Sequence, residues 1–137
     1  MDINELNSKV IAEFRANAGK VGGQFEGTPL LLLSTVGAKS GAERLNPLAY
    51  LDDGERLVII ASYAGAEQSP PWYFNLRKNP EVGVELGGES FRARAQIIAE
   101  PERSALFQAM VAQSPVFADY QAKTKRAIPV ITLSRLD

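Results

Sequence analysis

Residues 30–61 read LLLLSTVGAKSGAERLNPLAYLDDGERLVIIA, and this stretch decides the fold. It holds apolar runs of strand length, which are separated by a glycine-containing loop and by the pair Asp53-Gly54, a strong hairpin signal. We therefore expect three strands, over residues 30–35, 45–51 and 57–61. The third run is apolar throughout, so we expect that strand to be central in the sheet.

The rest of the chain alternates strands with short helices. Gly87 and Gly88 separate two apolar runs and predict a second hairpin. Pro47 cannot donate a ladder hydrogen bond, so we expect its strand at an edge or at a bulge. The remaining expected elements are strands over residues 82–86, 91–98 and 128–133, a helix from Pro70-Pro71 to Asn79-Pro80, and helices over residues 101–112 and 117–123.

Residues 2–18 are expected to form an amphipathic helix. Asp2 and Glu5 resemble a capping box, and Gly19 is a natural stop signal. The apolar side chains that recur at helical spacing are Ile3, Leu6, Val10, Ile11 and Phe14. Because the polar face carries mixed charges, we expect this helix to pack against the domain, with weak contact to a membrane surface as the alternative.

Together these elements predict an α+β fold with a mostly antiparallel sheet of about six strands. Hairpins make most of the connections, and a barrel or a strongly curved sheet closes such a set of strands. We expect a single domain over residues 1–137, with the N-terminal helix in residues 1–20 and the barrel core in residues 28–134.

Composition narrows the classes of function. The 137 residues include 15 Lys and Arg against 16 Asp and Glu, so we expect no nucleic-acid-binding surface. Without His and Cys, the chain has no Ser-His-Asp triad, no thiol nucleophile and no zinc site, and no acidic motif predicts another metal. No apolar run approaches the ~18 residues of a membrane span, and no signal-peptide pattern is present, so we expect a cytoplasmic protein. An enzyme of this composition would take its chemistry from a bound cofactor.

The loop over residues 37–44, GAKSGAER, is the first candidate binding site. Its two glycines allow the backbone to approach a ligand closely, and Ser40 adds a hydroxyl donor. Lys39 and Arg44 add charges that suit phosphate or carboxylate groups. The spacing differs from that of a P-loop. A solvated hairpin turn is the alternative interpretation.

Two further clusters are candidates for chemistry. Small residues at positions 61–66 follow a strand and precede Trp72, which leaves room for a flat ring; alternatively, Trp72 and Tyr73 are core residues of a short helix. Nearer the C-terminus, Tyr120 offers a phenol to a substrate. The basic residues that follow Tyr120 are alternatively a solvated helix end.

The order of these pieces resembles the deazaflavin-dependent nitroreductase family. The resemblance covers roughly residues 8–134, nearly the whole chain. The motifs that carry it are LLLLST (30–35), GAKSG (37–41), Arg44, NPL (46–48), Asp53-Gly54, Ala61-Ser62, Gly65-Ala66, Pro71-Trp72-Tyr73, Asn75-Leu76, Asn79-Pro80, Tyr120-Gln121, Thr124, Arg126 and IPV (128–130).

This resemblance implies a split β-barrel, related in shape to flavin-nucleotide oxidases of the pyridoxamine-phosphate type. It also implies binding of coenzyme F-420, an 8-hydroxy-5-deazaflavin with a phospholactyl-oligoglutamate tail. The implied activity is hydride transfer from reduced F-420 to small electron-poor acceptors such as nitroaromatics, quinones and conjugated enones, with the proton supplied by water or a phenol. The implied residues are Lys39, Ser40, Arg44 and Asn46 for the tail, Ser62, Ala64, Gly65, Ala66 and Trp72 for the ring or its linker, and Tyr120 as the catalytic residue on the substrate side.

The chain departs from the family pattern beside the expected ring site. Tyr63-Ala64 stands where relatives usually have Lys-Gly, and Ser69-Pro70 stands where they have His-Pro. Extra bulk at Tyr63 and Ala64 motivates an alternative function, a non-catalytic carrier of a fatty acid or a cofactor on the same barrel. A flavin mononucleotide-dependent oxidoreductase is a further alternative. Among partners we expect a small-molecule electron acceptor. Two alternatives stay open for the oligomeric state: a homodimer, since related split barrels often pair, or a barrel that the N-terminal helix covers instead.

Overall fold

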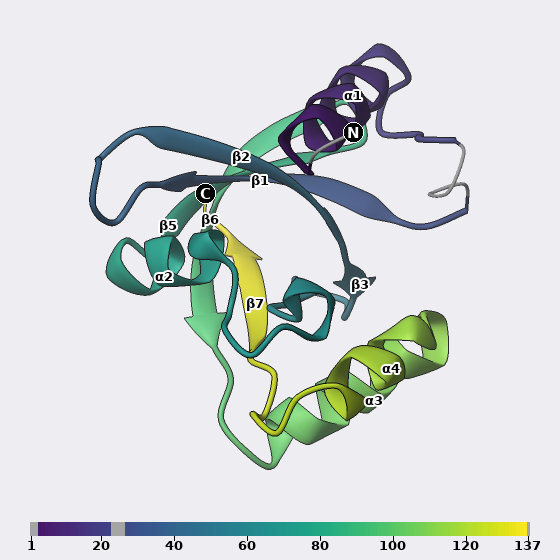
Figure 1. The fold of residues 1–137 in the computed structure, drawn as a ribbon. Helices are drawn as coiled ribbons and strands as arrows, with labels where there is room; N and C mark the ends of the chain where they lie inside the picture. Colours follow the sequence, from purple (N-terminus) through teal and green to yellow (C-terminus); the bar gives the residue numbers. More distant parts are fainter. Residues whose placement is uncertain (1–2, 23–26, 137) are drawn as a thin grey trace.

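The computed structural model describes residues 3–22 and 27–136, with side chains described from Glu5 onward (Figure 1). Its strands are β1 (Leu30–Val36), β2 (Glu43–Ala49), β3 (Leu51–Asp52), β4 (Arg56–Ile60), β5 (Glu81–Leu86), β6 (Glu89–Ile97) and β7 (Val130–Arg135). Its helices are α1 (Ile3–Ala16), the short 3-10 helix η2 (Tyr63–Gly65), α2 (Pro71–Lys78), α3 (Glu102–Gln113) and α4 (Val116–Ala122).

A single antiparallel sheet organises the molecule. Its strand order is β2-β1-β5-β6-β7-β4-β3. The two edge strands, β2 and β3, lie at opposite ends of this order, yet only Tyr50 separates them in the chain. The sheet must therefore curl until its edges come together, which gives the curved half-barrel in Figure 1. The expected α+β fold with a mostly antiparallel, strongly curved sheet is confirmed.

Within residues 3–22 and 27–136 there are seven strands, against the expected six, because the segment 45–51 divides in two. The division falls at Tyr50, whose backbone N–H donates to the carbonyl of Pro29 (3.3 Å). The strand that contains Pro47 is an edge strand, as we expected from the missing donor.

The expectation that residues 57–61 form a central strand was wrong. β4 pairs with β7 over five residues, but on its other side it has only the two residues of the edge strand β3. Its unbroken apolar run has another cause, because alternate side chains face two different cores. Leu57 and Ile59 face one hydrophobic cluster, whereas Val58 and Ile60 face a second one.

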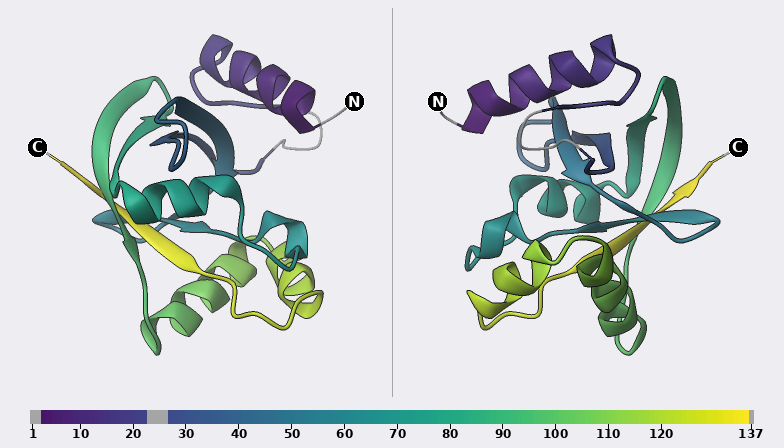
Figure 2. Two further views of the ribbon diagram at one scale, coloured as in Figure 1. Left: turned by 60° about the vertical axis from the view of Figure 1, so that its left-hand side comes forward. Right: turned by 90° about the vertical axis from the view of Figure 1, so that its right-hand side faces the viewer.

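Helices cover the sheet in three places. Trp72 and Leu76 of α2 pack into the cluster formed by the inner face of the sheet. α3 and α4 pack over the second cluster, and α1 lies at the opposite end of the molecule from them (Figure 2). None of the described helices has the length and apolar character that a membrane crossing requires.

The N-terminal helix packs against the sheet, as its pattern predicted. Val10 and Phe14 are buried against Leu30 and Leu32 of β1. The backbone becomes left-handed after the helix, with a φ of 95° at Gly19. Asp2, in the expected capping box, and the side chain of Ile3 lie outside the described residues.

Candidate functional site

The loop between β1 and β2 is stabilised by its own hydrogen bonds. The Gly37 N–H donates to the Ala42 carbonyl (2.7 Å), and the Gly41 N–H donates to the Gly37 carbonyl (2.9 Å). The Ser40 hydroxyl accepts from the Ala42 N–H (3.2 Å). A Cβ at Gly37 would lie 2.6 Å from the Ser40 Oγ, so a larger residue there would force the Ser40 hydroxyl out of its position. Ser40 therefore shapes the loop as well as facing solvent.

Asn75 of α2 ties this loop to the body of the protein. Its side chain is buried, accepts from the Ala38 N–H (2.9 Å) and donates to the Thr35 hydroxyl (3.1 Å). Lys78, on the same helix, donates to the Ala38 carbonyl (2.7 Å). The sequence motifs included Asn75 but assigned it no role. A polar amide between the apolar positions Trp72 and Leu76 was the signal that such a role existed.

The tied loop presents free donors. Lys39 and Arg44 are exposed, and within residues 3–22 and 27–136 neither forms an ion pair. The backbone N–H groups of Lys39 and Ser40 likewise donate to no described group. Such a set of rigidly held, unpaired donors is suited to an anion.

The register of the β1–β2 pair places Arg44 and Asn46 on the side of α2. Arg44 lies opposite Thr35, and Asn46 lies opposite Leu33. Directly opposed residues of an antiparallel pair share one face of the sheet. The Thr35 hydroxyl accepts a hydrogen bond from Asn75 of α2, so Thr35 lies on the face of the sheet that α2 covers. Arg44 and Asn46 therefore lie on that face as well.

A strained turn precedes α2. Tyr63, Ala64 and Gly65 are consecutive left-handed residues, with φ values of 49°, 55° and 83°. Ser62, just before them, is buried, whereas Tyr63 is 52% exposed. The Tyr63 side chain therefore extends into solvent. The left-handed φ at Ala64 gives a physical reason for the glycine that the resemblance implies at this position.

Arg126 holds this turn with five hydrogen bonds. Its guanidinium donates to the carbonyls of Ala66 (Nε, 3.0 Å), Ala61 (Nη2, 3.2 Å), Ser62 (Nη2, 3.1 Å) and Gln68 (Nη2, 3.1 Å), and to the Ser69 hydroxyl (Nη1, 3.1 Å). Burial lowers the pKa of Arg126, with an opposing contribution from Tyr73. The sequence motifs contained Arg126 but gave no hint of these contacts, because its acceptors lie far away in the chain.

The turn also packs against α4. A Cβ at Gly65 would lie 2.8 Å from the Tyr120 carbonyl oxygen and 3.0 Å from the Lys123 Cβ. Tyr120 is half-buried, and its ring meets the Phe117 ring edge-on, with 5.6 Å between centroids. The structure thus brings the backbone of Tyr120 against the predicted ring-side residue Gly65.

Trp72 is placed differently from the other predicted site residues. Only 4% of its surface is exposed, and it packs in the inner hydrophobic cluster. This is the core position that the alternative interpretation gave it.

Helix α2 connects the two groups of predicted residues. The strained turn precedes its N-terminus, and Asn75 and Lys78 near its C-terminus hold the loop between β1 and β2. Its eight residues span about 12 Å. The two groups of predicted residues therefore flank one short helix.

A shallow depression lies elsewhere, over β1, β5 and β6, with Ser34, Gly83 and Arg92 in its lining. Ser34 lies on the face of β1 opposite to that of its neighbour Thr35. None of the predicted site residues lines this depression.

Comparisons with known proteins show the family to which this chain is similar. A model of the family described as F-420H(2)-dependent quinone reductase matches residues 7–135. An F-420H(2)-dependent quinone reductase of Mycobacterium tuberculosis is 36% identical over 128 residues, which cover 90% of this chain and 86% of that protein.

Two solved structures are similar over most of the chain. One, described as an F-420-H2-dependent reductase (FDR-A), has a TM-score of 0.71 and 36% identity, and the match covers 77% of this chain and 94% of that one. The other, described as a domain-swapped dimer, has a TM-score of 0.73 and 32% identity, and the match covers 96% of both chains. The resemblance that the order of motifs indicated is confirmed. The chain belongs to the F-420H(2)-dependent quinone reductase family, whose name specifies reduced coenzyme F-420 as the cofactor.

Proposed function

We propose that this chain transfers a hydride from reduced coenzyme F-420 to small electron-poor acceptors, with quinones as the first class to test. The observation that carries the proposal is the pair of residue groups at the two ends of α2. One end holds unpaired donors for an anion, and the other end holds a fixed turn beside a tyrosine. F-420 has the matching shape, because an anionic tail is joined to a flat ring.

The residues present fit the tail. A phosphodiester and several carboxylates need cationic and N–H donors that are held in place before binding. Lys39, Arg44 and the backbone N–H groups of Lys39 and Ser40 provide such donors. Asn46 shares a face with Arg44 and extends the same surface. We assign these residues to the tail.

We assign the ring or its linker to the turn that contains Ser62, Ala64, Gly65 and Ala66. When bound, reduced F-420 supplies the hydride, and the protein orients the reactants and limits the access of water. Tyr120, beside the turn, is assigned to the substrate side, where its phenol can supply the proton. Trp72 remains in the proposal as the residue that anchors the start of α2 in the core, next to the turn.

A titration with F-420 tests the proposal directly. Trp72 is the only tryptophan, so its fluorescence should be quenched as the coenzyme binds, and calorimetry should give a matching heat. Oxidation of reduced F-420 in the presence of a simple benzoquinone should then follow saturation kinetics. Flavin mononucleotide and a fatty acid serve as competing ligands. Absence of both quenching and heat at tens of micromolar coenzyme would refute the proposal.

The loop assignment has its own test. Substituting Lys39 and Arg44 together by Ala should weaken F-420 binding by about tenfold to 100-fold, because two charge-assisted contacts are lost. The variant Lys9→Ala/Arg94→Ala removes the same charge from exposed positions elsewhere and should bind normally. Equal affinity of the two double variants would contradict the assignment.

A homodimer is part of the same proposal. It is supported by the 32% identical structure that is described as a domain-swapped dimer. Sedimentation of the purified protein tests it, and a single monomeric species at micromolar concentration would exclude it. The expected cytoplasmic location remains a prediction, which cell fractionation can check.

A further inference from the structure

We propose that Arg126 is a positioning residue of the reductase site, which fixes residues 61–69 in the shape that receives the deazaflavin ring without touching the coenzyme itself. The inference rests on the proposed function and adds to it the residue that shapes the ring end. It is carried by the number and placement of the hydrogen bonds that Arg126 donates.

One guanidinium holds both ends of the segment. Nη2 reaches the carbonyls of Ala61 and Ser62 at the start of the segment and that of Gln68 near its end. Nε and Nη1 reach Ala66 and Ser69. Only a planar group with several fixed donors can serve five acceptors at once, and a lysine ammonium has three donors on a flexible stem. The contact therefore requires arginine.

The segment depends on such external support. Its three left-handed residues include Tyr63 and Ala64, which lack the freedom of glycine. Within the turn, only two hydrogen bonds oppose that strain, from the Gly65 N–H to the Ser62 carbonyl (2.9 Å) and from the Ala66 N–H to the Tyr63 carbonyl (3.1 Å). A strained conformation persists where its surroundings impose it. Here Arg126 contacts residues on both sides of the strained triplet.

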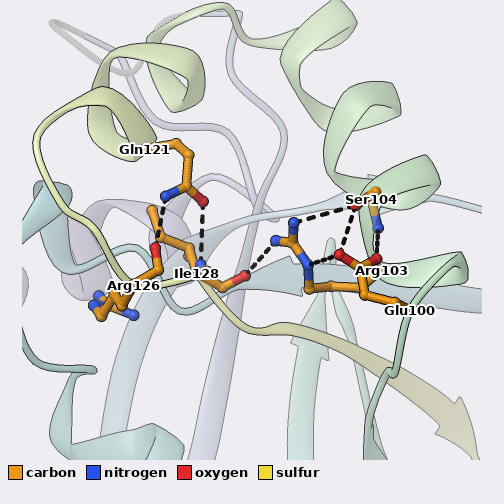
Figure 3. A network of polar contacts seen from close by, with 6 residues as sticks. All are labelled: Glu100, Arg103, Ser104, Gln121, Arg126 and Ile128. Atoms are coloured by element: carbon orange, nitrogen blue, oxygen red, sulfur yellow. Dashed lines mark hydrogen bonds and ion pairs between the residues drawn. The ribbon is translucent and has the colours of Figure 1, made fainter.

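Arg126 is itself held in place by α4 (Figure 3). The Gln121 side chain donates to the Arg126 carbonyl (2.7 Å) and accepts from the Ile128 N–H (3.1 Å). At the next peptide group, Arg103 of α3 donates to the Ile128 carbonyl (2.9 Å). The backbone that carries Arg126 is thus fixed to two helices, so its guanidinium presents a rigid template to the turn.

The partners of Arg126 distinguish it from Arg103. Arg126 forms no ion pair with any described carboxylate, and all its acceptors are neutral oxygens of residues 61–69. Arg103 pairs with Glu100 (3.1 Å) and contacts the Ser104 hydroxyl, away from the turn (Figure 3). Both arginines lie near Ile128, but only Arg126 reaches the predicted ring site. Because Arg103 helps to fix the backbone beside Arg126, the control is Arg56, whose guanidinium donates to Asp53 (3.0 Å) and Glu102, outside residues 61–69.

The test compares Arg126→Lys with Arg56→Lys against two ligands, F-420 and its tail-less core, 8-hydroxy-5-deazariboflavin. We expect Arg126→Lys to weaken binding of both ligands by the same factor, about tenfold, because the ring end is altered. Arg56→Lys should bind both ligands as the wild type does. The Lys39→Ala/Arg44→Ala variant should lose affinity for F-420 alone.

Hydrogen exchange separates positioning from general stability. The Gly65 and Ala66 amides should exchange faster in Arg126→Lys and should be unchanged in Arg56→Lys, whatever the melting temperatures of the two variants. In Arg126→Ala, millimolar methylguanidinium should restore part of the affinity for the tail-less core.

The outcomes are distinct. A wild type that binds neither ligand would refute the proposed function. A wild type that binds both, together with an Arg126→Lys variant of unchanged affinity for the core, would overturn the role of Arg126. If Arg126→Lys fails to fold, Ser69→Ala replaces it, since it removes one of the five acceptors. A measurable loss of core affinity in Ser69→Ala supports the proposal, and unchanged affinity contradicts it.

Discussion

Ala64 shows how one backbone angle can explain a family pattern. Its φ of 55° lies in the region that costs an L-residue with a Cβ about 1 kcal/mol. The family pattern that this sequence resembles has glycine at this position. Alanine in place of glycine at position 64 therefore lowers the stability of the folded turn. It also places only one extra methyl group near the expected ring.

We predict that Ala64→Gly stabilises the protein by about 0.5–1 kcal/mol, because glycine adopts this φ without strain. Urea unfolding measures the change. The control is Ala66→Gly, whose φ of −62° is ordinary, so glycine should destabilise that position through the entropy of the unfolded chain. A destabilised Ala64→Gly variant would contradict the strain that we assign to the turn.

The candidate site residues show how much of a site local sequence can predict. Lys39 and Arg44 were predicted because charge and loop composition are local properties. The contacts of Arg126 were not predicted, because its acceptors lie between 57 and 65 positions earlier in the chain. Only the packing of α4 against the turn brings them together. Trp72 was ambiguous, since an aromatic residue in a short helix suits both a core and a ring site.

At the scale of elements, α2 is the connector of the site. Its buried Asn75 joins the end of β1, through Thr35, to the loop between β1 and β2, through Ala38. A loop that was expected either to bind an anion or to be a solvated hairpin is thus fixed from behind. The Ala38 N–H and carbonyl are bonded to Asn75 and Lys78, whereas the N–H groups of Lys39 and Ser40 stay without a described partner.

We predict that Asn75→Leu destabilises the protein by about 2 kcal/mol, because the Ala38 N–H and the Thr35 hydroxyl lose their partner. The affinity for F-420 should fall as the loop loosens, whereas the affinity for the tail-less core should be kept. Urea unfolding and calorimetry measure the two effects. Gln108→Leu, at an exposed position of α3 without a described partner, should leave both quantities unchanged.

The elements themselves were largely predictable, since hairpin signals and helical spacing act over short distances. The boundaries and positions that failed have tertiary causes. An apolar run shows that a strand is buried, but it does not show the position of the strand in the sheet. For this reason β4 was predicted to be central, although it lies next to the edge strand β3. The break at Tyr50 follows from a hydrogen bond to Pro29, which no local pattern encodes.

At the scale of the whole molecule, Tyr50 lies where the curled sheet closes. Its ring packs against the inner hydrophobic cluster. Burial raises the pKa of Tyr50 above its ordinary value, and the neighbouring charge of Asp52 raises it further. The folded state therefore favours the neutral phenol. The stability that this provides is complete below the pKa of the unfolded chain, near 10, and is lost as the pH rises through the higher folded value.

We predict that Tyr50→Phe unfolds like the wild type near pH 8, because the hydroxyl has no described hydrogen-bond partner. At about pH 11 the wild type should be less stable than Tyr50→Phe. Only the wild type has a phenol at position 50, and this phenol ionises more readily in the unfolded chain than in the folded protein. Urea unfolding at the two pH values gives the comparison. Equal alkaline losses in both proteins would show that Tyr50 does not contribute to them.

The closed sheet also limits how this chain can associate. An exposed strand edge is a template for strand addition, and proteins protect such edges with prolines and with short strands. Here one edge strand contains Pro47 and the other has only two residues. Neither edge offers a long ladder of free amides to a second copy. Any assembly of this protein must therefore use faces or exchanged segments, and continued growth by sheet extension, the route toward fibrils, is disfavoured.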